Sequence, residues 1–282
     1  MTRRTHQPPP GVDQLATDLD RPFDAGDLLD RARATHVVHP AALADVDACE
    51  RRRRTAWRLH AAVSGELAAA AAARQRRFVL ISTDQLWERR GAAPAGEDCV
   101  PEPLNVYGWT KAVGEVAALR ADPDALVVRT NFFGLSTPWR RSSSDDILNT
   151  LRRHGRYAGF SDVWYTPIAL PLLCRHLLAA VDAGATGPLH LAGGERISKY
   201  DFGRRLARHH GLPPDCVTPR PIREATLAAP RPEDMSLDCS RAERLLGTPM
   251  PTVRESIEAV YGPPHPAVVG AAALHESQVD SR

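Results

Sequence analysis

The chain has 282 residues, of which 43% are hydrophobic, so it is long enough to bury one large core or two modest ones. Its formal net charge of +2 is close to neutral and gives no electrostatic reason to expect nucleic acid or an anionic membrane as a partner. The five cysteines are odd in number, scattered and without a CxxC pair, which argues against a disulfide framework and a zinc site. The pattern indicates reduced thiols in a cytoplasm. The histidines show no metal-ligand spacing, so no metal is expected.

The first 74 residues predict a disordered start followed by two helices around a short strand. Residues 1–12 are polar and Pro-rich, and they lack the apolar segment of a signal peptide. A helix is expected over 25–34, a strand over 35–39, and a long helix from 45 to about 74. The arginine run at 51–54 is expected on a solvated face of that helix, since no aromatic residues are interleaved with it.

The stretch from Phe78 to Glu115 carries the candidate chemistry. Its first part is an apolar, β-branched run that ends in small hydroxyl residues, as a buried parallel strand does at its carboxyl end. Its second part is a predicted helix in which Tyr107 and Lys111 are four residues apart and therefore project from one face. An ammonium beside a phenol would lower the phenol pKa, because the cation favours the phenolate. Thr83 at the strand end could then hold a substrate oxygen while Tyr107 transfers its proton.

Lysine is rare in this chain, which makes the position of Lys111 informative. The other lysine is Lys199, and 34 of the 36 basic residues are arginine. Retention of a lysine at 111 indicates chemistry that needs an ammonium rather than a guanidinium. The alternative is an amphipathic helix that carries a tyrosine and a lysine incidentally, and a lone YxxxK pattern would not decide between the two.

The Ser-Thr-Asp strand end at 82–84, together with Tyr107, Lys111 and the Gly-Glu pair that follows, resembles the extended short-chain dehydrogenases/reductases. The resemblance is strongest to their dTDP-4-dehydrorhamnose reductase-like branch. It implies a reduction of a nucleotide-sugar ketone, as in dTDP-rhamnose biosynthesis, with NADP or NAD as the cofactor. Tyr107 would be the general acid, Lys111 its pKa-lowering partner and Thr83 a hydrogen-bond donor to the substrate carbonyl.

The same resemblance assigns further site residues. On the cofactor side they are Asp20, Ala41, Ala42, Tyr107 and Lys111, the two alanines being small because the cofactor lies against them. On the substrate side they are Asp84, Asn131 and Phe132. For the last two, which end a strand predicted from residue 125, ordinary packing is an equally good interpretation.

Strands that alternate with helices of ten or more residues predict an α/β fold. By resemblance this is a Rossmann-like, doubly wound parallel sheet with a small carboxyl-terminal substrate lobe. The later elements expected are helices over 144–154, 168–183 and 199–210, a strand over 188–192, and two short helices after residue 238. The expected domains are a nucleotide-binding domain over 1–130, to which 165–192 returns, a substrate lobe over 131–262 and a flexible tail over 263–282.

One departure from the family pattern lies at the amino-terminal end. The family begins with a strand, a Gly-x-x-Gly-x-x-Gly turn and a helix, whose backbone N–H groups hold the cofactor pyrophosphate. No such turn precedes Thr35, so this first βα unit is expected to be absent, and Val12 to Asp20 corresponds to the family's second strand. His60 stands where the family usually has an asparagine, and His39 replaces another.

Two functions from different classes follow. The first is an NAD(P)H-dependent reductase of a nucleotide-sugar ketone, with activity impaired in the chain as given. The second is a non-catalytic binding or regulatory subunit that has lost dinucleotide binding. Retention of Thr83, Tyr107 and Lys111 favours the first, and loss of the Gly-rich turn favours the second. The expected partners are a small-molecule nucleotide sugar and a second copy in a homodimer, with no nucleic acid and no membrane.

Overall fold

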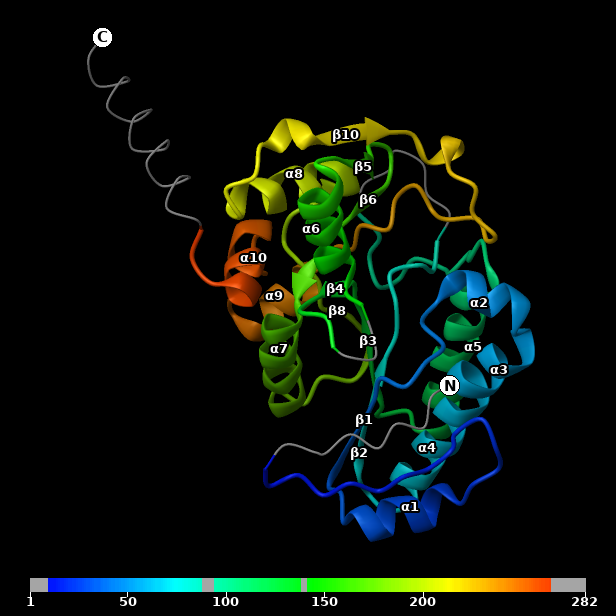
Figure 1. Cartoon of the computed structure of the whole chain (residues 1–282). Coiled ribbons are helices and arrows are strands. Elements are labelled where there is room, and N and C mark those ends of the chain that lie inside the picture. Colours follow the sequence, from blue (N-terminus) through cyan, green and yellow to red (C-terminus); the bar gives the residue numbers. More distant parts are fainter. Residues whose placement is uncertain (1–9, 88–93, 138–140, 265–282) are drawn as a thin grey trace.

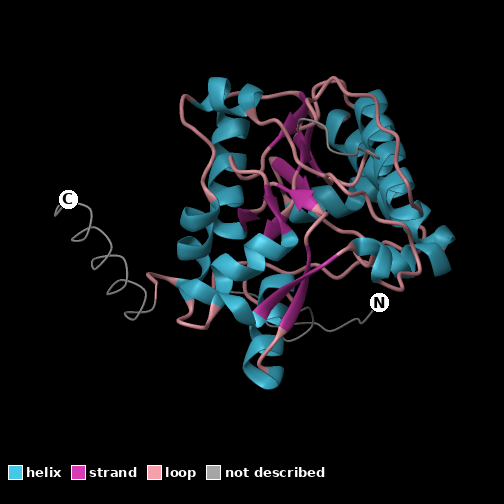
Figure 2. Cartoon of the chain, turned by 90° about the horizontal axis from the view of Figure 1, so that it is seen from above, coloured by secondary structure: helices cyan, strands magenta, loops and turns pink. Residues whose placement is uncertain are grey.

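A computed structural model describes residues 10–87, 94–137 and 141–264 of the chain. The residues predicted to form a disordered start and a flexible tail lie largely outside this part. The predicted α/β fold is confirmed: a parallel sheet of order β1-β2-β3-β8 lies between two groups of helices (Figures 1 and 2). Its strands are β1 (His36–His39), β2 (Arg77–Ile81), β3 (Leu126–Arg129) and β8 (Gly187–His190).

The helices form two sets, one before β3 in the chain and one after it. The helices before β3 are α1 (Ala25–Ala32), α2 (Val46–Arg51), α3 (Arg53–Trp57), a π-turn (Arg58–Ala62), α4 (Val63–Ala72) and α5 (Val106–Ala121). Those after it are α6 (Ser143–His154), α7 (Leu170–Asp182), α8 (Lys199–His209), α9 (Ser240–Leu246) and α10 (Val253–Tyr261). Short strands accompany the second set: β4 (Phe132–Phe133), β5 (Tyr157–Phe160), β6 (Trp164–Tyr165), β7 (Ile168–Ala169), β9 (Ile197–Ser198) and β10 (Val217–Arg220).

The alternation of side chains along β2 builds two cores, one on each face of the sheet. Phe78 and Leu80 are fully buried and pack with Val63 and Leu67 of α4. Val79, which points the other way, joins the larger core. Residues buried on both faces are expected of a parallel strand covered by helices on both sides. The near-continuous apolar run in the sequence therefore reflects a strand that is covered by helices on both faces.

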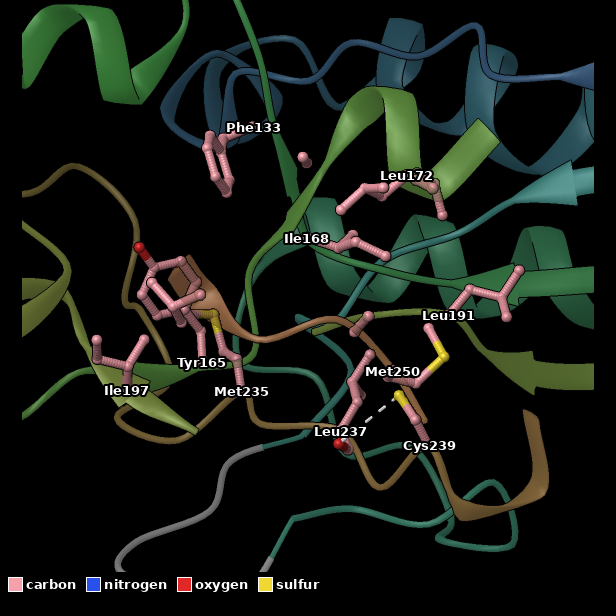
Figure 3. Close-up of a cluster of buried hydrophobic side chains, with 14 of the residues drawn as sticks. Phe133, Tyr165, Ile168, Leu172, Leu191, Ile197, Met235, Leu237, Cys239 and Met250 are labelled. Atoms are coloured by element: carbon pink, nitrogen blue, oxygen red, sulfur yellow. Dashed lines mark hydrogen bonds between the residues drawn. The ribbon is translucent and has the colours of Figure 1, made fainter. Parts of the chain in front are cut away.

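The larger core joins the sheet to the carboxyl-terminal half of the chain. Side chains from β4, β6, β7 and the segment before α9 converge there, as Figure 3 shows for Phe133, Tyr165, Ile168 and Met235. Phe133 and Tyr165 both contact the ring of Phe202 edge-on, at centroid distances of 5.1 and 5.8 Å. Since this core contains residues from both expected domains, the two halves are held together by apolar burial.

Most helix boundaries follow the sequence-based expectation, and the differences have local causes. Helix α1 ends at Ala32, because Arg33 adopts the left-handed conformation with a φ of 50°. The single helix expected over 45–74 is interrupted at Arg52, whose φ of −125° and ψ of 50° lie outside the helical region. It then passes through the π-turn before α4 begins. Helix α8 begins where predicted, and the Ser198 side chain caps it by accepting a hydrogen bond from the Asp201 N–H.

The expectation of a strand between Val12 and Asp20 is wrong. Residues 12–18 have no regular secondary structure, and Val12 is 53% exposed. A strand needs a neighbour to satisfy its backbone groups. In the described part of the chain, β1 pairs with β2 alone, so no strand lies on its other edge to pair with this segment. Val38 of β1 is accordingly 45% exposed.

Candidate active site

The amino-terminal end of α5 is fixed by two side chains. The N-cap Asn105 accepts a hydrogen bond from the Gly108 N–H at 2.9 Å, and the Glu50 carboxylate accepts one from the Val106 N–H at 2.9 Å. These bonds satisfy backbone donors that the first helical turn leaves without partners. They set the position of Tyr107, which follows in the first turn.

Lys111 joins α5 to the carboxyl end of β2. It is 4% exposed, and its Nζ donates a hydrogen bond to the Ile81 carbonyl oxygen at 2.5 Å. Burial lowers the pKa of Lys111 to about 8, while the carboxylate of Glu115 opposes that shift. The Lys111 ammonium is therefore held beside the strand end that leads to Thr83, and Tyr107 lies one helical turn earlier on α5.

The Gly-Glu pair after Lys111 has a structural role. A Cβ added to Gly114 would lie 2.1 Å from the His60 carbonyl oxygen, so only glycine allows α5 to pack this closely on the π-turn. Glu115 is buried and accepts hydrogen bonds from the Arg129 guanidinium, the shortest at 2.8 Å, and one from the Ser82 hydroxyl. These contacts anchor the site helix to β2 and β3.

His60 connects the loop after β1 to α5. Its Nε2 accepts a hydrogen bond from the Leu43 N–H at 3.0 Å, so the proton is on Nδ1, which donates to the Thr110 hydroxyl at 2.7 Å. The ring meets Tyr107 edge-on at a centroid distance of 5.5 Å. Burial, with the charge of Lys111, lowers the pKa of His60 to about 3. His60 is therefore neutral, and its ring packs against the candidate catalytic Tyr107.

His39 ends β1 and is a second buried, neutral histidine. It is 4% exposed and packs near the Phe78 ring. Burial, again with the charge of Lys111, lowers its pKa to about 4. Its Nε2 is buried without a hydrogen-bond partner among the residues that the structure describes. An unsatisfied buried nitrogen of this kind costs stability, so its position at the end of β1 is imposed by the packing around it.

Thr83 and Asp84 continue β2 into the site, and both are buried. The Thr83 hydroxyl donates to Asp84 Oδ1 at 3.3 Å and accepts from the Gln85 N–H at 3.2 Å. Asn131 donates from Nδ2 to Asp84 Oδ2 at 2.6 Å. Burial raises the pKa of Asp84 to about 6, and the Asn131 hydrogen bond opposes that shift. The structure thus brings together two of the three expected substrate residues.

Phe132, the third of them, is 42% exposed, whereas its neighbour Phe133 is buried in the core. An exposed aromatic ring at a strand end is available to a ligand. Lys199 Nζ lies 5.8 Å from the Tyr165 ring centroid; burial lowers the pKa of Lys199, and the carboxylate of Asp84 opposes that shift. Sequence reasoning did not assign Lys199 to the site. The sequence does hold one signal for it, since Lys199 is one of only two lysines in an arginine-rich chain.

The residues expected on the cofactor side lie in two places. Ala41 and Ala42 are half-buried in the loop that His60 ties to α5, through Leu43. Asp20 lies apart from them: its carboxylate accepts from the Thr55 hydroxyl at 3.4 Å. The two alanines therefore lie in a loop tied to α5, close to the candidate catalytic helix, and Asp20 contacts the start of α3.

A dinucleotide requires N–H groups to hold its pyrophosphate, usually at a helix amino terminus after a strand. In residues 10–35 the one helix is α1, which follows a turn, and its first-turn N–H of Asp27 is already bound by the Asp24 carboxylate. That negative charge disfavours a phosphate there. Residues 10–35 therefore do not fit the pyrophosphate of such a cofactor, and contact of its nicotinamide end with Tyr107 and Lys111 stays a prediction.

A sequence model of the family described as "RmlD substrate binding domain" matches residues 4–263, which is nearly the whole chain. The chain belongs to the RmlD substrate-binding domain family. This places it among the dTDP-4-dehydrorhamnose reductase-like extended short-chain dehydrogenases/reductases, as the motifs at Thr83, Tyr107 and Lys111 indicate.

Relatives of this RmlD-family chain include proteins of two kinds. The dTDP-4-dehydrorhamnose reductase of Mycolicibacterium smegmatis is 33% identical over 244 residues, which are 83% of this chain and 71% of the relative. The methionine adenosyltransferase 2 subunit beta of Bos taurus is 29% identical over 240 residues, covering 79% of this chain and 71% of the relative. Proteins similar to this chain are thus named both as reductases and as subunits.

Solved structures agree with the fold. A dTDP-4-dehydrorhamnose reductase ortholog from Clostridium acetobutylicum superposes with a TM-score of 0.79 at 25% identity, covering 86% of this chain and 85% of that one. The dTDP-4-dehydrorhamnose reductase of Bacillus anthracis, solved in complex with NADP, gives 0.78 at 21% identity, over 84% and 83% of the two chains. The α/β sheet described above is therefore the RmlD-type Rossmann-like fold.

Two further observations concern metal binding and membrane spans. Among the described residues, no three His, Cys, Asp or Glu side chains lie together in a way that could hold a metal ion. In the same part of the chain, every helix is too short or too polar to cross a membrane.

Proposed function

We propose that this chain is an NAD(P)H-dependent reductase of a nucleotide-sugar ketone, of the dTDP-4-dehydrorhamnose reductase type. The observation that carries the proposal is the bond from Lys111 to the Ile81 carbonyl oxygen at 2.5 Å. This bond holds the face of α5 that bears Tyr107 against the end of β2, from which Thr83 follows. A phenol, an ammonium and a hydroxyl at one strand end form the minimal set for protonating a ketone oxygen.

In this proposal Tyr107 donates its proton to the carbonyl oxygen as that oxygen gains negative charge. The Lys111 ammonium stabilises the phenolate that remains, because opposite charges favour the ionised form. Thr83 donates a hydrogen bond to the same oxygen and orients it. Asp84, Asn131 and Phe132 contact the sugar. A positioned general acid of this kind contributes about 10²–10⁴-fold to the rate.

A reduced nicotinamide, NADPH or NADH, supplies the hydride in this class of reaction. Tyr107 and Lys111 face its nicotinamide and ribose in the proposal, and the loop of Ala41 and Ala42 lies against it. Asp20 is proposed to contact the adenosine end. Because the described residues provide no amides for the pyrophosphate, we expect the chain to bind the cofactor weakly.

The test is turnover of dTDP-4-dehydrorhamnose at millimolar NADPH, compared with the variant Tyr107→Phe. We expect kcat to fall by about 10²–10⁴-fold in that variant, because the ring stays and the proton is lost. Tyr157→Phe, on β5, is the matched control and should keep wild-type turnover. Equal turnover in wild type and Tyr107→Phe would overturn the assignment of Tyr107 as the acid.

A binding or regulatory subunit is the second candidate. It is favoured by the open edge of β1 and by the carboxylate that caps α1 where a phosphate would need N–H groups. The similarity to proteins named as a methionine adenosyltransferase subunit points the same way. Binding of a nucleotide sugar without turnover, at cofactor concentrations that saturate the enzyme from Mycolicibacterium smegmatis, would favour this candidate over the reductase.

A further inference from the structure

A cavity with a volume of about 230 Å³ lies beside α8, and arginine side chains dominate its walls. Three of them, Arg204, Arg205 and Arg208, come from α8 together with Asp201. They follow Asp201 by three, four and seven residues, so all four side chains share one face of the helix. The loop before α8 adds a fourth arginine, Arg196. The proposed reductase chemistry uses none of these residues.

The cavity lies apart from the candidate active site. Trp164 of β6 lines it, and the next residue, Tyr165, points to the opposite face of the strand. Tyr165 belongs to the larger core (Figure 3), and the Lys199 ammonium lies on its side of the strand, 5.8 Å from its ring centroid. A ligand in the cavity would therefore be distinct from the proposed substrate.

Two of the four arginines are held by carboxylates. Arg196 donates from Nε and Nη2 to Asp234 Oδ2 at 3.1 and 2.8 Å, and its guanidinium carbon lies 4.1 Å from the Trp164 ring centroid. Arg205 Nη2 forms an ion pair with Glu195 Oε1 at 2.5 Å. These contacts fix both guanidinium groups, and each retains N–H donors that its carboxylate does not use.

Arg204 and Arg208 lack comparable partners. Arg204 Nη2 lies 3.6 Å from Asp215 Oδ1, but the Asp215 side chain is 96% exposed, so this pair is weak. Arg204 Nε is buried without a hydrogen-bond partner in the described part of the chain. Arg208 is exposed and forms no ion pair with any described residue. Since the two arginines are four residues apart, their charges repel each other along the helix, and a bound anion would relieve that repulsion.

Asp201 restricts which anion fits, because it is the one acidic residue on the wall of the cavity. Its carboxylate accepts a hydrogen bond from the Ser198 hydroxyl at 2.6 Å, which leaves further lone pairs. An anion without a proton, such as sulfate, would be repelled by this carboxylate. Inorganic phosphate keeps a P–OH group at neutral pH that can donate to Asp201, and its other oxygens match the N–H fork of arginine.

We propose that this cavity binds a phosphate ion, with Arg204 and Arg208 donating to its oxygens and Asp201 accepting its P–OH proton. The volume is below the range of about 300–1,000 Å³ that is usual for drug-sized ligands, which suits a small anion. A phosphate monoester shares the chemistry, but with a second pKa of about 6 it has mostly lost the proton at pH 7. Asp201 therefore favours the free ion. The proposal does not depend on the proposed function.

Calorimetric titration at pH 7 in a buffer without phosphate or sulfate tests the choice of ligand. The probes are inorganic phosphate, glycerol 3-phosphate and sulfate. We expect the last two to bind about tenfold more weakly than phosphate or worse, since neither brings a proton to Asp201. Equal affinity for sulfate, or no measurable binding of phosphate, would overturn the proposal. Tighter binding of glycerol 3-phosphate would overturn the choice of the free ion.

Variants test the residues. We expect Arg204→Gln and Arg208→Gln each to weaken phosphate binding by about tenfold or more, as loss of a charge-assisted hydrogen bond does. Arg120→Gln, at an exposed position of α5, makes the same change of charge and should bind like wild type. Unchanged phosphate affinity in both cavity variants would overturn the proposal.

A further variant gives a readout that does not depend on how the arginine variants fold. Asp201→Asn removes the negative charge and keeps a side-chain acceptor for Ser198. We expect this variant to lose most of the preference for phosphate over sulfate, mainly because sulfate binds more tightly. A preference equal to that of the wild type would show that Asp201 does not contact the anion and would overturn its assigned role.

Discussion

The two edges of the β1–β2 pair differ sharply. Beyond β2, the buried pair of Glu115 and Arg129 makes many contacts, and we call its surroundings the saturated region. Both side chains are 4% exposed. Arg129 donates a hydrogen bond to the Glu97 carbonyl oxygen at 3.1 Å and lies 5.2 Å from the Trp87 ring centroid. Beyond β1, the sheet has no further strand among the described residues, and Val38 is 45% exposed.

The saturated region carries the proposed proton donor and the proposed substrate residues, and its Glu115 carboxylate accepts hydrogen bonds from Arg129 and Ser82. Before β1, by contrast, the first-turn N–H of Asp27 in α1 is bound by the Asp24 carboxylate, which makes this helix end unsuited to a phosphate. The described residues therefore order the proposed substrate side of the site, and those before β1 form no phosphate site.

The largest effect is expected from breaking the buried pair. Arg129→Met leaves the Glu115 carboxylate buried without its partner, which should lower the free energy of unfolding by about 3–5 kcal/mol. Arg254→Met removes an exposed pair of the same type, Arg254 to Glu258 at 2.9 Å, and should cost less than about 1 kcal/mol. Urea unfolding of both variants gives the two values. Similar losses of unfolding free energy in the two variants would contradict the difference between the saturated region and exposed ion pairs.

The second effect is a pH dependence at the border between the regions. Folding lowers the pKa of His60 to about 3 and of His39 to about 4, from 6.5 for an ordinary histidine. Both stay neutral in the native state, so their stabilisation is complete above pH 6.5 and is lost as the pH falls toward those values. Each should contribute a slope of about 1.4 kcal/mol per pH unit in that window.

The pH effect is measured as the unfolding free energy between pH 4.5 and 7.5. His60→Gln should flatten the slope by the contribution of one histidine, whatever its effect on stability at neutral pH. His154→Gln, at an exposed position of α6, is the control and should keep the wild-type slope. A wild-type slope in His60→Gln would mean that His60 is protonated in the native state.

Local patterns predicted the parts of the molecule that depend on neighbours in sequence. The apolar run of β2 and the helical spacing of Tyr107 and Lys111 both follow from residues within one or two turns. The pairing of Glu115 with Arg129 and the contact of Lys199 with the Tyr165 ring could not be predicted, because both join elements whose relative position depends on the whole fold.

The error over Val12 to Asp20 has the same origin. A strand is stabilised by pairing with its neighbours more than by its own sequence. A segment that corresponds to a strand in the family therefore stays irregular when no strand pairs with it. Likewise, the π-turn that contains His60 packs closely against Gly114 of α5, a long-range contact that helix propensity does not report.

The smallest effect is expected at the open edge. Val38→Ala should change the free energy of unfolding by less than about 0.5 kcal/mol, because the side chain is half exposed. Val127→Ala, in the fully buried β3, should cost about 1.5–3 kcal/mol. Thermal or urea unfolding compares them. A cost at Val38 as large as that at Val127 would show that another segment covers the β1 edge in solution.

Calorimetric titration of the purified chain with NADPH and NADH tests the central claim most directly. Two or three charge-assisted N–H bonds to the pyrophosphate are worth on the order of 3–6 kcal/mol, and each 1.4 kcal/mol is tenfold in affinity. A cofactor that such bonds would hold at micromolar concentration should therefore bind this chain at millimolar concentration or more weakly. Micromolar binding of either nucleotide would contradict the account and would show that another part of the chain builds the phosphate site.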